Sequence, residues 1–244
     1  MPICLILPCF NEATRLKGEV LSTFVANNPA CHICLVNDGS TDNTGSVIEA
    51  LRAKHPAQME TLHLERNEGK AEAVRRGMLH AASSFRFDVV GYWDADLATP
   101  LSELPALLEA VAVGTGRTVA IGSRLRRLGS SIERALVRHT LGRVFATAAS
   151  LVLGLPVYDS QCGAKIFHVT LVPILFGERF STAWLFDVEL LARLRNHLGR
   201  AECLSATVEV PLTAWSDVRG SKMSVVQMIA APLGLLRIHL RYNR

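Results

Sequence analysis

Short apolar runs alternate with helix-like segments in the first part of the chain, and this alternation restricts the fold more than any other feature. The runs predict strands, and the intervening segments repeat apolar residues every three or four positions. Strands are expected at 3–7, 33–36, 60–64 and 89–93, and helices at 12–26, 44–53 and 68–82. This order is typical of an α/β fold, with a mainly parallel sheet, right-handed crossovers and helices on both faces.

The second half is less regular. Its strands are expected at 118–121, 164–167 and 204–210, and its helices at 131–153 and 184–197. An apolar helical tail follows residue 221, with an interruption near Pro232. No linker-like change of composition, internal repeat or low-complexity run separates the halves, so we expect one domain.

Two stretches of the chain have a local excess of basic residues. The chain has 26 Lys and Arg against 22 Asp and Glu, a smaller basic excess than nucleic-acid-binding proteins usually have, so no nucleic-acid partner is expected. Residues 117–143 nevertheless contain seven Arg and one acid, and residues 219–244 contain five Lys or Arg and no acid. Such local clusters predict a localised anionic partner, which is a phosphate, a phospholipid surface or both.

Two apolar segments raise the question of a membrane. Residues 144–157 and 225–236 are shorter than the roughly 20 residues that span a bilayer, and Arg residues flank both. They fit either core helices or helices lying among lipid headgroups. The first residues show no basic region of a signal peptide, so we expect reduced thiols in a cytosolic protein. Cys31 and Cys34 are therefore expected to be buried core thiols.

Polar residues follow each of the first four predicted strands. These loops span 8–12, 37–44, 66–70 and 94–100, and they are rich in Asp, Asn, Glu, Gly or Lys. Ligands of open α/β sheets bind at the carboxyl ends of the strands. The sequence thus predicts a binding site at this edge.

Two of these loops suggest particular chemistry. Asp94 and Asp96 follow a buried strand, and alternation along an extended chain would point both carboxylates the same way. Together they could hold Mg²⁺ or Mn²⁺ on a substrate diphosphate; the alternative is a solvated turn that caps the next helix. Residues 37–44 contain neither a dinucleotide-binding nor a P-loop pattern, so a carboxylate there would accept from ribose hydroxyls or a base N–H.

In order along the chain, these motifs resemble family 2 inverting glycosyltransferases with the GT-A fold. The motifs of the first half are Pro8 with Asn11-Glu12, residues 36–42, residues 67–70 and residues 94–96. The motifs of the second half are residues 122–124, 159–165, 186–191 and Trp215 with 220–222. They resemble the polyprenyl-phosphate branch of the family. Dolichyl-phosphate β-glucosyltransferases are most similar, and the mannosyltransferases are close neighbours. Asn37 and Ala98 depart from the family pattern.

The resemblance implies a division of labour. Residues 1–115 would bind the nucleotide sugar, residues 116–223 the acceptor, and 224–244 would form a C-terminal helix, amphipathic like the acceptor-side helix. The implied nucleotide-binding residues are Pro8, Asn11, Glu12, Asp38, Ser40, Lys70 and Asp94. Asp94 and Asp96 would hold Mg²⁺ or Mn²⁺, with Asp96 the better direct ligand. Lys70 could equally be an ordinary surface lysine.

The acceptor half supplies cations. The candidates for holding an acceptor phosphate are Arg124, Arg134, Arg138 and Lys222, because Arg clasps phosphate with two N–H groups. Asp159 and Gln161 could orient the sugar or acceptor, which makes Asp159, Gln161, Arg124 and Lys222 the candidate catalytic set. Asp159 could instead be the ion-pair partner of an Arg.

Two further pairs are ambiguous. Asp187 and Glu189 are two residues apart, so at most one would reach a site from a helix, and helix capping is the alternative for Asp187. Trp184 and Trp215 could stack on a sugar, anchor at a lipid interface or pack in the core.

The leading hypothesis is a metal-dependent glycosyltransferase that moves glucose from UDP-glucose to a polyprenyl phosphate, peripherally bound at the cytoplasmic membrane face. Its acceptor oxygen is already anionic, so a general base is not required. One alternative is a transferase that takes its sugar from GDP-mannose. Another is a transferase whose acceptor is a glycan hydroxyl, which requires a carboxylate base. A third alternative is a protein without activity that binds a nucleotide sugar or a membrane surface. A nucleotidyltransferase is disfavoured, because its glycine-rich start is missing.

Overall fold

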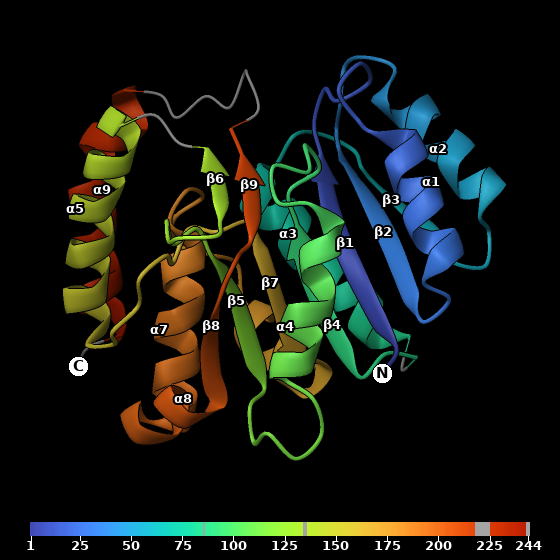
Figure 1. The fold of residues 1–244 in the computed structure, drawn as a ribbon. Helices are drawn as coiled ribbons and strands as arrows, with labels where there is room; N and C mark the ends of the chain where they lie inside the picture. The colour runs from blue at the N-terminus through green and yellow to red at the C-terminus, as the bar shows by residue number, and fades with distance from the viewer. Residues whose placement is uncertain (85, 134–135, 218–224, 243–244) are drawn as a thin grey trace. The chain divides into compact units, whose positions relative to one another are not determined.

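The computed structural model describes residues 1–84, 86–133, 136–217 and 225–242, and it confirms an α/β fold with mainly parallel strands (Figure 1). The chain forms two compact units. The first comprises Met1–Leu97 and Ala164–Arg179, and the second comprises Ala98–Gly163 and Phe180–Arg244.

Strands of the first unit pair in the order β3-β2-β1-β4-β7. All are parallel except β7, which is antiparallel to β4. The strands are β1 (Ile3–Cys9), β2 (Cys31–Asp38), β3 (Met59–Leu64), β4 (Val89–Trp93) and β7 (Ala164–His168). The helices are α1 (Gly18–Asn27), α2 (Thr44–Lys54), α3 (Lys70–Ser83) and α6 (Val172–Phe176), with a 3₁₀ turn at Val169–Leu171. Strands β1 and β4 are buried along nearly their whole length, which explains their continuous apolar sequences.

Helices cover both faces of this sheet. Gly77 of α3 lies so close to Ile6 that a Cβ at position 77 would be 2.3 Å from Ile6 Cγ2, and Val36 is its next neighbour. Gly45 of α2 lies against the side chain of Asn37. Because consecutive strand residues point to opposite faces, Val36 and Asn37 place α3 and α2 on opposite faces, as predicted (Figure 1).

The second unit contains two parallel strand pairs and a group of longer helices. Strand β5 pairs with β8, and β6 pairs with β9. These strands are β5 (Val119–Ser123), β6 (Ser131–Glu133), β8 (Thr207–Pro211) and β9 (Ala214–Ser216). The helices are α4 (Leu104–Ala110), α5 (Leu136–Leu153), α7 (Phe186–Leu198), α8 (Arg200–Ala206) and α9 (Val225–Tyr242), with a 3₁₀ turn at Leu101–Glu103. Helices α5, α7 and α9 pack against one another.

Most boundaries agree with the sequence-based prediction to within a few residues, but three do not. The helix expected at 12–26 begins only at Gly18, because Glu12 first forms a separate turn with Arg15 and Leu16. Residues 131–133 form β6 rather than a helix, since they pair with β9. Residues 204–206 end α8 rather than begin a strand. Short apolar runs fit either structure until their partners are known.

The predicted interruption at Pro232 is also wrong, because α9 continues through it. Proline removes one backbone hydrogen bond from a helix. Ala231, Leu235 and Ile238 on either side of it are buried, and this packing supports the helix across the proline. Within the described ranges, no helix has both the length and the apolarity needed to cross a bilayer.

All six cysteines lie in the described part of the chain, and all are buried free thiols. This confirms the expectation that Cys31 and Cys34 are core residues. Burial raises the pKa of Cys9, Cys31 and Cys34 to about 12.

Native protein is therefore expected to resist iodoacetamide at pH 8, because the thiolate is the reacting species and only a minute fraction is ionised there. Unfolding in urea should expose all six thiols. Mass spectrometry of the alkylated protein measures both states. Rapid native labelling of Cys31 or Cys34 would contradict the buried assignment.

Candidate active site

The loops that follow β1 and β2 are joined by hydrogen bonds. The backbone N–H of Asn11 donates to Ser40 Oγ at 3.1 Å, and the backbone N–H of Thr41 donates to Asn11 Oδ1 at 2.9 Å. Asn11 has a φ of 54°, a left-handed conformation that few residues other than glycine adopt. The structure thus brings Asn11 and Ser40 together at the sheet edge, where Pro8 lies near the end of β1.

Asn37, which departs from the family pattern, makes hydrogen bonds within the turn after β2 and to β3. Its Oδ1 accepts from the backbone N–H of Ser40 at 3.0 Å, and its Nδ2 lies 3.3 Å from His63 Nδ1. An amide serves both contacts through one acceptor and one donor. This position therefore shapes the turn after β2.

Asp38 joins the loop after β2 to the loop after β3. It is only 2% exposed, and its two oxygens accept the backbone N–H groups of Glu68 at 2.8 Å and Gly69 at 2.9 Å. Burial raises the pKa of this carboxyl group. The sequence indicated a ligand-binding role for Asp38, but it did not reveal that this carboxylate orders the loop before Lys70.

Gly39 brings the same two loops into direct contact. It has a φ of 59°, and a Cβ at this position would lie 2.2 Å from the carbonyl carbon of Arg66. Gly39→Ala is therefore expected to lower the free energy of unfolding by about 1–3 kcal/mol or more, through overpacking and backbone strain. Urea denaturation measures the change.

Gly114→Ala is the matched control, because Gly114 has a φ of 93° but a Cβ at this position would have no neighbour within 4 Å. It should show the backbone strain alone, and hence the smaller loss of stability. Equal losses of unfolding free energy in the two variants would show that the close approach to Arg66 does not contribute to the effect of Gly39→Ala.

Asp94 and Asp96 lie on the open side of a turn that follows β4. The backbone N–H of Leu97 donates to the carbonyl oxygen of Asp94 at 3.0 Å, and Leu97 has a φ of 52°. The extended chain expected here is therefore wrong, because this hydrogen bond closes a turn. Ala95 and Leu97 are nevertheless buried while both carboxylates are half-buried, so the acidic side chains do share the accessible side.

Lys70 contacts this turn directly. Lys70, the first residue of α3, donates from its Nζ to Asp94 Oδ1 at 2.5 Å. Both side chains are more than one-third exposed, so the pair adds little to stability. The structure thus brings Lys70 into contact with the turn that carries Asp94 and Asp96.

The acidic motif, which consists of Asp94 and Asp96, fits a hard divalent cation that takes some of its ligands from the protein and the others from a substrate. In the part of the chain that the structure describes, no three His, Cys, Asp or Glu side chains are grouped to enclose a metal. Two half-buried carboxylates are nevertheless what Mg²⁺ commonly takes from a protein, the remaining ligands being water and substrate phosphates. Asp94 and Asp96 therefore suit a divalent metal.

Sequence reasoning missed Arg15. Its guanidinium forms a two-point ion pair with Glu12, one bond being 2.9 Å from Nε to Oε2. The hydrogen bond to Glu12, together with the nearby charges of Glu12 and Asp96, raises the pKa of Arg15. The Glu12-x-x-Arg15 spacing was the available signal. Glu12 is thus a carboxylate paired with a guanidinium group.

The second unit has its own cluster around Arg124. Arg124 donates from Nε to Asp159 Oδ2 and from Nη2 to Asp159 Oδ1, both at 2.7 Å, and its backbone N–H donates to Oδ2 at 3.0 Å. The guanidinium also lies over the Trp215 ring, 5.4 Å from its centroid. The alternative interpretation of Asp159, as an ion-pair partner of an Arg, is confirmed, and the buried Trp215 packs beneath that pair.

Two residues that sequence reasoning missed support this cluster. Glu209 of β8 accepts the backbone N–H groups of Tyr158 and Asp159, each at 2.7 Å. Arg143 of α5 donates to the Tyr158 carbonyl at 2.8 Å and lies over the tyrosine ring. These contacts hold the start of the 159–165 motif in place.

The next two residues of that motif carry polar atoms that the protein leaves unsatisfied. Ser160 Oγ and Gln161 Nε2 are buried, and neither has a hydrogen-bond partner among the described residues. Buried polar groups are normally paired, so such atoms are candidates for contact with a ligand or water. Gln161 therefore keeps its place as a candidate binding residue.

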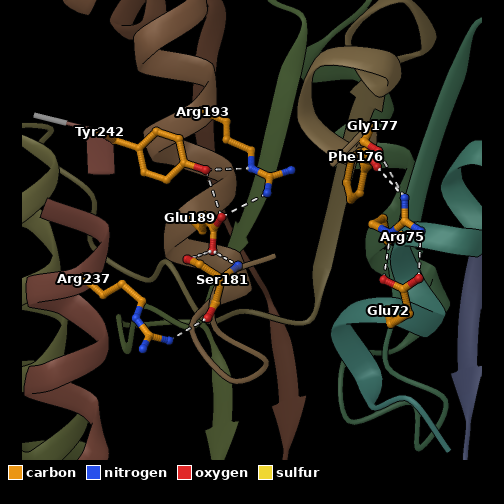
Figure 2. A network of polar contacts seen from close by, with 9 residues as sticks. All are labelled: Glu72, Arg75, Phe176, Gly177, Ser181, Glu189, Arg193, Arg237 and Tyr242. Atoms are coloured by element: carbon orange, nitrogen blue, oxygen red, sulfur yellow. Dashed lines mark hydrogen bonds and ion pairs between the residues drawn. The ribbon is translucent and has the colours of Figure 1, made fainter. Parts of the chain in front are cut away.

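Glu189 is a structural residue rather than a free carboxylate. It is completely buried, and it accepts hydrogen bonds from Ser181, Arg193 and Tyr242 (Figure 2). The capping interpretation of Asp187 is wrong, because α7 begins at Phe186 with Leu185 in the N-cap position.

Four candidates from the sequence remain: Arg134, Arg138, Lys222 and Trp184. Arg134 and Lys222 lie outside the described residues, and at Arg138 the structure describes only the backbone of α5. Trp184 is half-buried and packs against the Phe145 ring, with 5.4 Å between centroids.

Sequence comparisons identify relatives along almost the whole chain. The profile described as Glycosyl transferase family 2 matches residues 4–173. Dolichyl-phosphate beta-glucosyltransferase ALG5C of Trichomonas vaginalis is 28% identical, covering 98% of this chain and 71% of the relative. Dolichyl-phosphate beta-glucosyltransferase of Drosophila melanogaster is 31% identical, covering 92% of this chain and 70% of the relative.

A solved structure shares the fold. Glucosyl-3-phosphoglycerate synthase from Mycobacterium tuberculosis, crystallised with Mn²⁺, UDP and glucosyl-3-phosphoglycerate, superposes with a TM-score of 0.70 at 20% identity, covering 99% of this chain and 79% of that one. The expected GT-A fold and the interpretation as a hexosyltransferase are both confirmed. Since the family profile covers well over half of its length, the chain belongs to glycosyl transferase family 2.

Proposed function

We propose that this enzyme transfers glucose from UDP-glucose to the phosphate of a polyprenyl phosphate, with inversion at the sugar carbon. The observation that carries the donor side is the meeting of Lys70 with the Asp94–Asp96 turn, at the carboxyl ends of the strands. The relatives named dolichyl-phosphate beta-glucosyltransferase, which match nearly the whole chain, support the acceptor and the sugar.

On the donor side, residues 1–115 would bind the nucleotide sugar. Pro8, Asn11, Glu12 and Ser40 would surround the nucleoside, and Asp38 would order the loop that presents Lys70. Asp94 and Asp96 would hold Mg²⁺ or Mn²⁺, whose positive charge stabilises the departing nucleoside diphosphate. The neighbour structure crystallised with Mn²⁺ and UDP supports a divalent metal.

Lys70 would add a second positive charge near the leaving diphosphate. Its ammonium group already pairs with a carboxylate at this edge of the sheet. A diphosphate carries more negative charge than one carboxylate, so Lys70 would turn towards it when the donor binds.

The acceptor half needs cations rather than a base. An anionic oxygen of the acceptor phosphate attacks the anomeric carbon; the new C–O bond forms as the bond to the diphosphate oxygen breaks, and no proton has to be removed. We propose that Arg124, Arg134, Arg138 and Lys222 steer this phosphate. Gln161 would orient it or the sugar from a loop fixed by the Arg124–Asp159 pair.

The test is a transfer assay with purified protein and Mg²⁺ or Mn²⁺. UDP-glucose and GDP-mannose are supplied as donors, and a polyprenyl phosphate or the corresponding polyprenol as acceptors. A glucosylated lipid formed only from UDP-glucose and only on the phosphate is the expected result. Transfer from GDP-mannose would move the assignment to a mannosyltransferase. Transfer to polyprenol or a glycan but not to the phosphate would overturn the acceptor proposal.

A further inference from the structure

Helix α9 has two different faces. One stripe is buried against the protein and consists of Ala231, Leu235 and Ile238. The other faces outward and consists of Leu233, Leu236 and Leu240, which are 71%, 52% and 58% exposed. Single exposed leucines are normal on a protein surface, but a helical stripe of them indicates an interaction surface.

The exposed stripe belongs to a firmly held helix. At its C-terminal end the Tyr242 hydroxyl donates to the buried Glu189 (Figure 2). Arg195 donates to the Tyr242 carbonyl at 2.6 Å. In its middle, a Cβ at Gly234 would lie 2.6 Å from the Leu185 side chain. These contacts fix which side of α9 faces outward.

A second exposed apolar stripe lies on helix α5. This helix packs beside α9 (Figure 1) and exposes Val144 by 66% and Leu151 by 77%, seven residues apart on one side. Seven residues are nearly two helical turns, so these side chains lie on one stripe of α5. We name the outward-facing apolar residues of the two helices the α5/α9 face; they are Val144, Leu151, Leu233, Leu236 and Leu240.

The charge at this surface selects an anionic occupant. Arg237 and Arg241 are exposed on α9 beside the leucines. Residues 219–244 contain no Asp or Glu, although the whole chain is almost balanced in charge. Leucines on one side with arginines beside them are typical of helices that lie in the interface of a membrane, where apolar burial and attraction to anionic lipids act together.

We propose that the α5/α9 face docks on the surface of an anionic lipid bilayer, with the leucines at the boundary between headgroups and acyl chains and the arginines at the headgroups. The proposal rests on the proposed function in one respect, that a polyprenyl phosphate resides in a bilayer. The docking itself is a property of this surface and can be measured without any transfer reaction.

The test is flotation of the purified protein with vesicles. Vesicles of phosphatidylcholine with phosphatidylglycerol are compared with vesicles of phosphatidylcholine alone. The protein should bind the anionic vesicles, and higher salt should weaken the binding. Leu236→Asp/Leu240→Asp should reduce binding at least about tenfold, because charged groups replace two apolar ones at the lipid boundary. Arg237→Gln/Arg241→Gln should reduce only the preference for anionic lipid.

Val20→Asp is the matched control, since Val20 is a 48% exposed apolar residue on the surface of α1. It should bind vesicles like the wild type. Circular dichroism confirms that the aspartate variants remain folded. Failure of the folded wild type to bind anionic vesicles, or equal binding by the Leu236→Asp/Leu240→Asp variant, would overturn the proposal. So would a dimer in solution that this variant converts to a monomer, because the face would then be a contact between two copies.

A transfer assay separates this proposal from the proposed function. With a short, water-soluble polyprenyl phosphate, the Leu236→Asp/Leu240→Asp variant should retain wild-type rates. With a long-chain acceptor in vesicles it should lose at least about tenfold. Vesicle binding without any transfer would contradict the proposed function alone, and transfer to the soluble acceptor without vesicle binding would contradict the docking alone.

Discussion

Asp96→Asn is expected to lower the rate of sugar transfer at least about a hundredfold, because the substitution removes a charge that would hold the metal on the diphosphate. The side chain keeps its shape, and it lies half-buried on a turn, so the fold should persist. Initial rates give the loss of transfer. Calorimetric titration of UDP with and without Mn²⁺ should show that the metal no longer strengthens nucleotide binding.

Asp88→Asn is the matched control for this variant. Asp88 is an exposed acid immediately before β4, at the opposite end of the strand that Asp94 and Asp96 follow. It should leave both transfer and nucleotide binding unchanged. Wild-type rates and intact metal-dependent UDP binding in Asp96→Asn would remove this residue from the proposed site.

Glu189→Ala is expected to lower the free energy of unfolding by about 3–5 kcal/mol, the usual cost of breaking a buried ion pair from one side. Glu189 is fully buried, and Arg193, which donates to it at 3.0 Å, is 6% exposed. The substitution leaves that guanidinium without its carboxylate, and it leaves the Ser181 N–H and the Tyr242 hydroxyl without their acceptor (Figure 2). Chemical denaturation followed by circular dichroism measures the loss.

Tyr242→Phe provides the graded comparison. It removes one donor to Glu189 and one acceptor of Arg193 Nε, and it should cost only about 1–2 kcal/mol. A loss below that value in Glu189→Ala would contradict the structural role. Glu189→Gln tests the other possibility, that this carboxylate is a base for a hydroxyl acceptor. Abolished transfer with unchanged stability in Glu189→Gln would favour that chemistry.

The first half of the fold was predictable because its signals are local. The apolar run of β4 and the helical period of α3 are visible in neighbouring residues, and both elements form within two residues of their expected bounds. The rule that ligands bind at the carboxyl ends of parallel strands then selected the loops carrying Lys70 and Asp94. The structure places these two side chains in contact.

The missed elements depend on distant partners. Strand β6 exists because Ile132 pairs with Trp215, far along the chain, and nothing in its own three residues distinguishes it from the start of a helix. Helix α9 passes through Pro232 because buried residues on both sides hold it. Neither pairing nor packing is recorded in a local pattern.

The sequence by itself determined the class of fold, the order of its strands and helices in the first half, the acidic motif after β4 and the family that the chain resembles. These follow from periodicity and from the spacing of residue types, which neighbouring positions record. The tertiary structure alone decided which polar groups neutralise one another. Asp159 holds Arg124, Asp38 holds the backbone of the loop before Lys70, and Glu189 anchors α9. A buried charge must find its partner in space, and that partner is usually distant in sequence.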